Sequence, residues 1–211
     1  MDSAFFRAWL AEVGTVIEAQ RDHLTQLDAA IGDADHGINL ARGFGAIAVA
    51  LEQAATPTPG SVLILAGSTL ISKVGGASGP LYGMALRQAG KSLGDTNDAS
   101  LPDLAASLEA ALAGVQKLGA AREGEKTMVD ALAPAVAALQ KAISEGAGTD
   151  AALAAAARAA AEGAHATIPM HALKGRASYL GPRSVGHEDP GAASTALIIG
   201  ALRDVAQRQV S

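Results

Sequence analysis

Hydrophobic residues recur along this chain at spacings of three and four, and this periodicity constrains the fold more than any other feature. The clearest series is Leu101, Leu104, Leu108, Leu112, Val115 and Leu118. Such a series places its apolar side chains on one face of an α-helix. The alternating pattern of half-buried strands is hard to find anywhere. The sequence therefore predicts an all-α fold.

The composition supports the same fold class. Hydrophobic residues make up 49% of the 211 residues but aromatic residues only 3%, so the core has to be built from Ala, Leu, Val and Ile, and Ala and Leu lead the helix-propensity scale. A chain of this length suits one domain, residues 1–211, and short connections make neighbouring helices antiparallel. We expect about eight helices, near residues 3–27, 37–54, 61–73, 78–93, 101–119, 126–145, 149–167 and 190–208.

Charge and hydropathy argue against several classes of protein. A net charge of −5 and a pI near 5.5 argue against a nucleic-acid partner, because a basic surface would be expected. The most apolar stretches, residues 61–71 and 151–161, are too short to span a bilayer. The absence of cysteine fits a reducing compartment. The N-terminal segment lacks the pattern of a signal peptide, so we expect a cytoplasmic protein with no membrane partner.

A short acidic segment carries three carboxylates, Asp28, Asp33 and Asp35, beside Gly32 and Gly37. Carboxylates this close repel one another unless a cation lies among them, and oxygen ligands suit Mg²⁺ or Ca²⁺. An EF-hand loop is excluded, because its later ligand and glycine positions are not matched. Two interpretations stay open. The segment is either a divalent-metal site or a set of acids that cap a helix start.

Two glycine-rich segments give weaker signals. Residues 75–80, Gly-Gly-Ala-Ser-Gly-Pro, lie between two expected helices and predict either a phosphate cradle at a helix start or a plain interhelical turn. Residues 119–127 nearly match a P-loop, but Glu125 separates Gly124 from Lys126 and no strand precedes them. A Walker-type NTPase is therefore disfavoured, and Gly124 is better explained as part of a helix start.

A long segment at residues 169–189 shows no clean periodicity. Its basic and imidazole side chains are His171, Lys174, Arg176, Arg183 and His187. Loops this long inside a compact domain are usually functional or disordered. Because basic residues gather here in an acidic protein, we predict a lid over an anion. Asp189 followed by Pro190 marks the next helix start, where backbone amides also favour anions.

Taken together and in this order, the motifs resemble one family. They are residues 27–39 (LDAAIGDADHGIN), 75–80 (GGASGP), 124–128 (GEKTM), 175–179 (GRASY) and 186–191 (GHEDPG). The set is similar to the nucleotide-binding L subunit of dihydroxyacetone kinase in its free-standing form. The resemblance implies an antiparallel barrel of eight helices, with a nucleotide and two Mg²⁺ ions held at one end.

The resemblance also implies roles for individual residues. Asp28, Asp33 and Asp35 would be the Mg²⁺ ligands. The nucleotide would be bordered by His36, Gly37, Ile38, Asn39, Ala77, Ser78, Gly119, Met128, Arg176, Asp189, Pro190 and Gly191. No side chain is expected to act as a nucleophile, because metal and lid position the phosphates. Arg176 is the one side chain considered for a catalytic role.

The function implied by the resemblance is phosphoryl transfer from a Mg²⁺-bound adenine nucleotide, ADP or ATP being the bound cofactor, to dihydroxyacetone held on a separate K subunit. In the branch linked to the phosphotransferase system, a phosphohistidine M subunit rephosphorylates bound ADP, so the nucleotide is a lasting cofactor. Two alternatives stay open. One is an ATP-exchanging subunit for another small ketose or tetrose, and the other is a nucleotide-sensing protein without transfer activity.

Three positions depart from the usual pattern of this family. Ala34 stands where glycine is frequent, Glu125 where aspartate is frequent, and Pro182 where an acidic residue is frequent. None of them is an implied ligand. Ala34 needs a backbone angle that an L-residue can adopt, and Pro182 is expected to stiffen the lid. Lid closure and nucleotide retention are the properties that these changes affect most.

Overall fold

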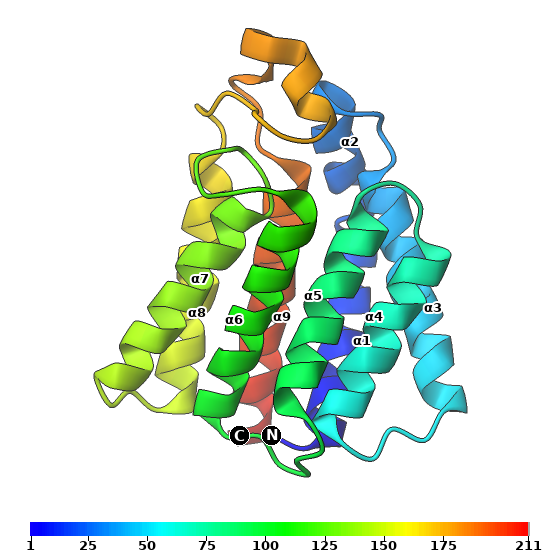
Figure 1. Cartoon of the computed structure of the whole chain (residues 1–211), viewed down its shortest axis with the longest axis vertical. Helices are drawn as coiled ribbons and strands as arrows, with labels where there is room; N and C mark the ends of the chain where they lie inside the picture. The colour runs from blue at the N-terminus through cyan, green and yellow to red at the C-terminus, as the bar shows by residue number, and fades with distance from the viewer. Residues whose placement is uncertain (211) are drawn as a thin grey trace.

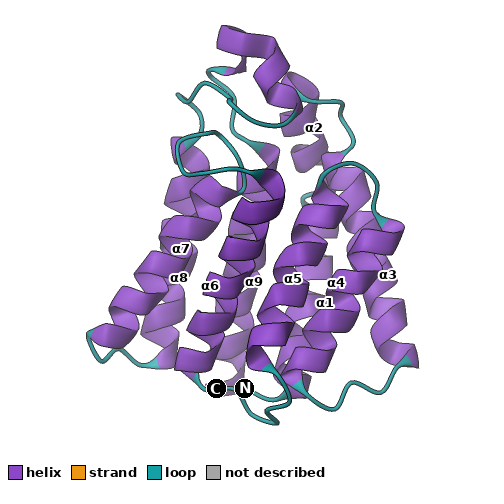
Figure 2. Ribbon diagram, viewed as in Figure 1, coloured by secondary structure: helices purple, strands orange, loops and turns teal. Residues whose placement is uncertain are grey.

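The computed structural model describes residues 1–210, and in that range it contains helices and no strand (Figure 2). The α-helices are α1 Ser3–Ala19, α2 Arg21–Ile31, α3 His36–Gln53, α4 Pro59–Lys73, α5 Ser78–Leu93, α6 Leu101–Gly119, α7 Val129–Ser144, α8 Thr149–Ala166 and α9 Pro190–Val210, and η1 Arg176–Ser184 is a 3₁₀ helix. The predicted all-α fold is confirmed. None of these helices is both long enough and apolar enough to cross a membrane.

Eight of the helices form a closed ring. α3 packs on α4, each following helix packs on the next as far as α9, and α1 closes the ring between α9 and α3. Figure 1 shows the chain termini at one end of this barrel and α2 with η1 at the other. The predicted eight-helix antiparallel barrel is therefore confirmed, with α2 and η1 as additions over one end.

Small residues let the barrel helices approach closely. A Cβ atom added to Gly67 of α4 would lie 2.5 Å from the carbonyl oxygen of Gly83 in α5, and one added to Gly90 would lie 2.6 Å from the carbonyl oxygen of Gly60. Such distances leave no room for a side chain. Glycine at these positions therefore lets the backbones of neighbouring helices come into direct contact.

The first predicted helix, residues 3–27, is wrong in its extent. The structure has two helices there, with a break at Gln20, and the second continues to Ile31. No Pro or Gly marks this break, so the local sequence gave no signal for it. The change of direction lets α2 pack against both α3 and α9 over the end of the barrel.

The predicted helix at residues 126–145 begins later than expected. α7 starts at Val129, because Lys126 has a left-handed backbone with φ of 61°. Asp130 holds the preceding turn by accepting hydrogen bonds from the backbone N–H of Gly124 at 2.5 Å and of Thr127 at 2.7 Å. Lys126 and Met128 therefore belong to the turn that precedes α7 and not to the helix itself.

The predicted lid at residues 169–189 contains the 3₁₀ helix η1, which the sequence did not predict. Gly181 has a positive φ of 56° and Pro182 follows it, so a regular α-helix cannot form here. A small apolar cluster of Ile31, Ala172 and Ala177 attaches this segment to the end of α2. Residues 169–189, called the lid below after their predicted role, thus form a folded element that packs on the barrel end through a small apolar cluster.

Candidate nucleotide and metal site

A cavity of about 310 Å³ lies at the lid end of the barrel. α3, α5, α7 and α9 all begin at this end, and their first residues or N-caps line the cavity or its rim. Helix starts present unpaired backbone N–H groups and the positive end of the helix dipole. Four helix starts around one cavity favour a strongly anionic ligand such as a phosphate chain.

The three carboxylates predicted as metal ligands lie together at this end. One oxygen atom from each of Asp28, Asp33 and Asp35 lies within 4.8 Å of the others. Asp28 belongs to the last turn of α2, Asp33 to the connection, and Asp35 to the N-cap position of α3. This spacing of hard oxygen ligands fits Mg²⁺, which is held by a few carboxylates and completes its shell with phosphate oxygens.

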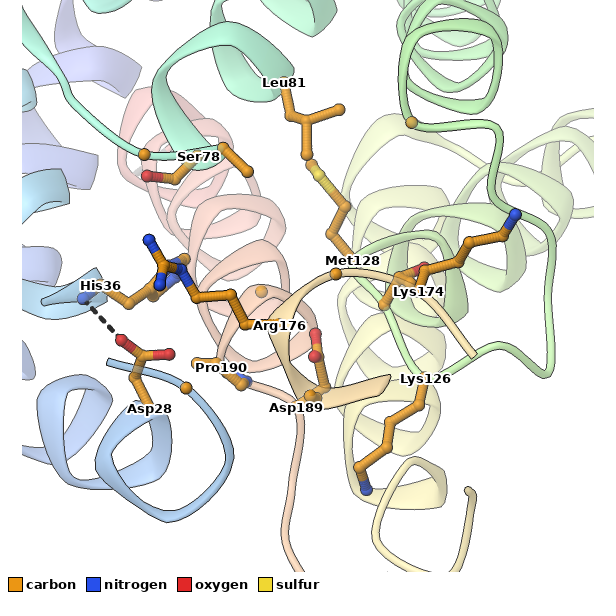
Figure 3. A pocket seen from close by; sticks show the side chains of 18 of the residues that line it. Asp28, His36, Ser78, Leu81, Lys126, Met128, Lys174, Arg176, Asp189 and Pro190 are labelled. Atoms are coloured by element: carbon orange, nitrogen blue, oxygen red, sulfur yellow. Dashed lines mark hydrogen bonds between the residues drawn. The ribbon is translucent and has the colours of Figure 1, made fainter. Parts of the chain in front are cut away.

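Asp28 also caps α3. Its Oδ2 atom accepts hydrogen bonds from the backbone N–H of Asp35 at 2.9 Å and of His36 at 3.2 Å. Figure 3 shows the second of these bonds. Asp35, although it stands at the N-cap position, makes no side-chain capping bond. The capping and metal interpretations of the acidic segment are therefore compatible, because capping engages one oxygen of Asp28 and leaves the other carboxylate oxygens available.

Two small residues shape the acidic connection. A Cβ atom at Gly32 would lie 2.0 Å from Oδ1 of Asp28, so only glycine leaves room for that carboxylate. Ala34 has a left-handed backbone with φ of 61°, a conformation that favours glycine. An alanine pays about 1 kcal/mol or more for that conformation.

The lid reaches the acidic cluster through Arg176. Its Nη2 atom lies 3.0 Å from Oδ2 of Asp33, and its side chain is 68% exposed. An ion pair this exposed contributes little to stability. Its significance is positional, because it places the guanidinium beside the carboxylate of Asp33. Figure 3 shows the Arg176 side chain extending towards His36 and Asp28.

A buried polar network supports the floor of the site. Nε2 of His36 lies 2.8 Å from Oγ of Ser194, which lies 2.7 Å from the hydroxyl of Tyr82. The Tyr82 hydroxyl donates to the carbonyl oxygen of Gly191 at 2.8 Å. Burial lowers the pKa of His36 and raises that of Tyr82, so both side chains are neutral at pH 7. The network fixes the first turn of α9 relative to α3 and α5.

Asp189 is a buried carboxyl at the edge of the cavity. Its Oδ2 accepts a hydrogen bond from the backbone N–H of Ala192 at 2.8 Å, which caps α9. Burial raises the pKa of Asp189 to about 7, against the opposing effects of that hydrogen bond and of Lys126. This carboxyl is thus poised between its two protonation states near neutral pH.

The opposite side of the cavity is apolar. Leu81, Val115, Ala121 and Met128 line it, and Figure 3 shows Leu81 and Met128 facing each other. A Cβ atom at Gly119 would meet Leu81 at 3.4 Å, which is an ordinary contact distance, so Gly119 lies directly against this apolar wall. Such a cavity suits a nucleotide. The phosphates fit the side with the carboxylates and helix starts, and the base fits the apolar side.

Comparison with known proteins agrees with this geometry. A model of the DAK2 domain matches residues 30–204. The chain belongs to the DAK2 domain family. The ADP-binding subunit DhaL of PEP-dependent dihydroxyacetone kinase from Escherichia coli (strain K12) is 40% identical over 194 residues, which cover 92% of each chain. The ADP-binding subunit DhaL of the PTS-dependent dihydroxyacetone kinase from Lactococcus lactis is 41% identical, over 93% of this chain and 94% of that protein.

Solved structures show the same DAK2 architecture. The dihydroxyacetone kinase of C. freundii in its native form superposes with a TM-score of 0.75 at 28% identity, and its complex with AMP-PNP and Mg²⁺ superposes with a TM-score of 0.73 at 30% identity. Each match covers 95% of this chain and 34% of the other chain, so this DAK2 domain spans about a third of that kinase. The predicted resemblance to the L subunits, and the assignment to a family of kinases, are confirmed.

Most of the residues predicted from the DAK2 resemblance line the cavity. They are Asp28, Asp33, Asp35, His36, Ala77, Ser78, Gly119, Met128, Arg176, Asp189, Pro190 and Gly191. Gly37, Ile38 and Asn39 are not among the lining residues. A Cβ at Gly37 would lie 2.0 Å from the carbonyl oxygen of Arg21, so this glycine serves the contact of α2 with α3. Ile38 is 51% exposed, and Asn39 accepts a hydrogen bond from Arg42. Contact between the nucleotide and any of these predicted residues stays a prediction.

Some lining residues were not predicted as site residues of the DAK2 domain. They include Leu81, Tyr82, Val115, Ala121, Lys126, Thr127 and Lys174. Leu81 and Tyr82 follow Ser78 by three and four residues on α5, and that helical spacing could have identified them. Lys126 and Thr127 belong to the motif at residues 124–128. Nothing in the sequence predicts the positive φ of Lys126, so their place beside the cavity was missed.

Proposed function

We propose that this chain is the ADP-binding subunit of a PEP-dependent dihydroxyacetone kinase. The observation that carries the proposal is the cluster of Asp28, Asp33 and Asp35, whose oxygen atoms lie within 4.8 Å of one another at a cavity bordered by helix starts. The relatives named as ADP-binding subunits at about 40% identity over nearly the whole chain support it. The whole chain, residues 1–211, would act as one nucleotide-binding domain, with residues 169–189 as its lid.

The proposed ligand is ADP or ATP with two Mg²⁺ ions. Asp28, Asp33 and Asp35 would hold the metal, and the starts of α3, α5 and α9 would receive the phosphates. The base would lie between Leu81 and Met128. Bound Mg²⁺ would neutralise and orient the phosphate oxygens for in-line transfer. The donor set fits this ion because it offers carboxylate oxygens and no softer ligand.

The protein groups would contribute position rather than covalent chemistry. Arg176 would turn from Asp33 towards the phosphates and, with the lid, exclude water from the transferred group. Neutral His36, fixed by Ser194, would hold the first turn of α3 under the phosphates. We propose no nucleophile in this chain, because the accepting hydroxyl belongs to the ketone.

The proposed partners follow from the same assignment. Dihydroxyacetone would be bound on a separate K subunit, which would bring its hydroxyl to the phosphate end of the cavity. A phosphohistidine M subunit would return a phosphoryl group to ADP, which would then remain bound as a cofactor. The relatives called subunits of PEP-dependent and PTS-dependent kinases support this arrangement. The cytoplasmic location stays a prediction.

A second candidate is a kinase subunit for a tetrose. The L-erythrulose 1-kinase of Mycolicibacterium smegmatis is 42% identical over 85% of this chain, which spans 31% of that protein. The same nucleotide site would then serve a different ketone. Reconstitution separates the candidates, since transfer from a phosphohistidine donor without added ATP supports the first and transfer to erythrulose from ATP supports the second.

Calorimetric titration of ADP in the presence of Mg²⁺ tests the core of the proposal. We expect Asp33→Asn to weaken binding by at least about tenfold, because one charged ligand of a hard cation is neutralised. Asp95→Asn is the matched control, since Asp95 is exposed between α5 and α6 at the far end of the barrel. Equal affinities of the wild type and Asp33→Asn would exclude Asp33 as a metal ligand.

A further inference from the structure

Lys126 connects the two ends of the lid. We propose that Lys126 is a positioning residue that clamps the lid base and thereby slows nucleotide release, a role that rests on the proposed function for its ligand. Its Nζ donates hydrogen bonds to the carbonyl oxygens of Thr167, at 2.5 Å, and of His187. These two carbonyls lie on either side of the lid, one before it and one at its end.

The clamp is buried beneath the site. Lys126 is 1% exposed, and Figure 3 shows its amine directed away from Met128 and below Asp189. The amine therefore does not point at a ligand in the cavity. The buried amine directs two of its three N–H donors at backbone carbonyls, so it acts on the chain that carries those carbonyls.

Further hydrogen bonds close the same base. The backbone N–H of Gly186 donates to the carbonyl oxygen of Ile168 at 2.8 Å, and the backbone N–H of Asp189 donates to Oγ1 of Thr167 at 2.9 Å. Leu173 of the lid donates to the carbonyl oxygen of Glu125 at 3.1 Å. The lid base is thus tied to the turn before α7, which also presents Met128 to the apolar side of the cavity.

Burying the Lys126 amine lowers the stability of the folded protein locally, which indicates a functional role. No carboxylate in the described part of the chain forms an ion pair with the Lys126 amine, and burial lowers its pKa against the more distant charges of Asp189, Asp130 and Glu188. Its backbone is also left-handed, with φ of 61°. A buried charge and a strained backbone angle persist where the surrounding structure needs them, most often at functional sites.

The clamp acts on the ligand through the lid. Between the two clamped carbonyls lie Lys174 and Arg176, which line the cavity, and Arg176 reaches Asp33. Loss of the clamp would let this segment move while the barrel core keeps its own packing. The expected effect is faster release of nucleotide rather than loss of the fold.

Two measurements on Lys126→Met test the proposal, with Lys126→Gln as a milder variant whose amide still donates to one carbonyl. The first is hydrogen exchange without nucleotide, where amides of residues 168–186 should exchange at least about tenfold faster and those of the barrel helices should not change. The second is stopped-flow release of fluorescent ADP with Mg²⁺, which should be about tenfold faster because charged hydrogen bonds are lost. Lys141→Met is the matched control, since Lys141 is 75% exposed in a surface ion pair.

The outcomes separate this inference from the proposed function. Faster exchange confined to the lid together with faster release supports the clamp. Unchanged lid exchange, unchanged release, or equal acceleration in lid and barrel would overturn it, and so would loss of the helical fold in both variants, because Lys126 would then serve the whole barrel. Failure of the wild type to bind ADP would instead refute the proposed function, while the exchange experiment would still test the clamp on the lid.

Discussion

The substitution Gly32→Ala should displace the carboxylate of Asp28, a proposed metal ligand, without changing that residue. The added Cβ would lie 2.0 Å from Oδ1 of Asp28 and 3.0 Å from its backbone carbonyl. Ordinary contact begins near 3.4 Å, so the carboxylate has to move by about 1.4 Å. The backbone angles of Gly32, φ −142° and ψ −135°, do not require glycine by their sign of φ. The effect therefore comes from the contact alone.

This displacement has two measurable costs. It breaks the hydrogen bonds from Asp35 and His36 to Oδ2 of Asp28, and losing two bonds to a charged acceptor should lower the free energy of unfolding by about 3–6 kcal/mol. In a domain of this size each kcal/mol lowers the Tm by about 2–4 °C, so the Tm should fall by about 6 °C or more. Binding of Mg²⁺ with ADP should weaken by at least about tenfold, because Mg²⁺ tolerates little departure from octahedral geometry.

Differential scanning calorimetry and titration of ADP with Mg²⁺ measure the two effects. Gly45→Ala is the matched control, since a Cβ there meets no atom within 4 Å and the exposed helix position should gain about 0.5–1 kcal/mol. Gly32→Ala with wild-type affinity for the metal and nucleotide would refute the argument that Asp28 is held in place for a ligand.

Three further substitutions probe other parts of the site. Asp189→Asn tests a pH effect. The pKa of Asp189 in the folded protein is about 7, above the usual value of 3.8. The stability that this carboxyl contributes is therefore fully present below the usual pKa and is lost as the pH rises through 7. Thermal unfolding at pH 5 and pH 8 should show a smaller difference in the variant, and an unchanged difference would contradict the assignment. Tyr82→Phe removes the hydroxyl that bonds Gly191 and should lower the free energy of unfolding by about 1–2 kcal/mol in chemical denaturation; no change would show that the network is not stabilising. Ala34→Gly relieves a left-handed alanine and should raise the Tm, since the gain of about 1–2 kcal/mol exceeds the entropic cost of glycine; a lower Tm would mean that the loop tolerates alanine without strain.

The fold was largely predictable because its determinants are local. Spacings of three and four fix most helices, and short connections fix their antiparallel order. The break at Gln20 was not predictable, because it depends on α2 packing across the barrel end and no helix-breaking residue marks it. η1 was missed for a similar reason, since Ala172 and Ala177 pack against Ile31, which is far from both in the sequence.

The candidate site was predictable where a short motif carries it. Asp28, Asp33 and Asp35 lie close in sequence and in space, so the acidic segment could be identified from residue type and spacing. The clamp of Lys126 on Thr167 could not, because it joins segments separated by 41 positions through a backbone carbonyl that any residue offers. Sequence motifs therefore predict ligand-binding side chains better than they predict the long-range contacts that hold those side chains in place.

The central claim is that Asp28, Asp33 and Asp35 hold divalent metal against the phosphates of a nucleotide. A crystal structure grown with ADP and Mn²⁺, with an anomalous difference map, tests it most directly, since Mn²⁺ takes the oxygen ligands that Mg²⁺ prefers. The account predicts anomalous peaks in contact with these carboxylates and with phosphate oxygens at the starts of α3, α5 and α9. ADP bound without metal at these carboxylates, or metal bound elsewhere, would contradict it.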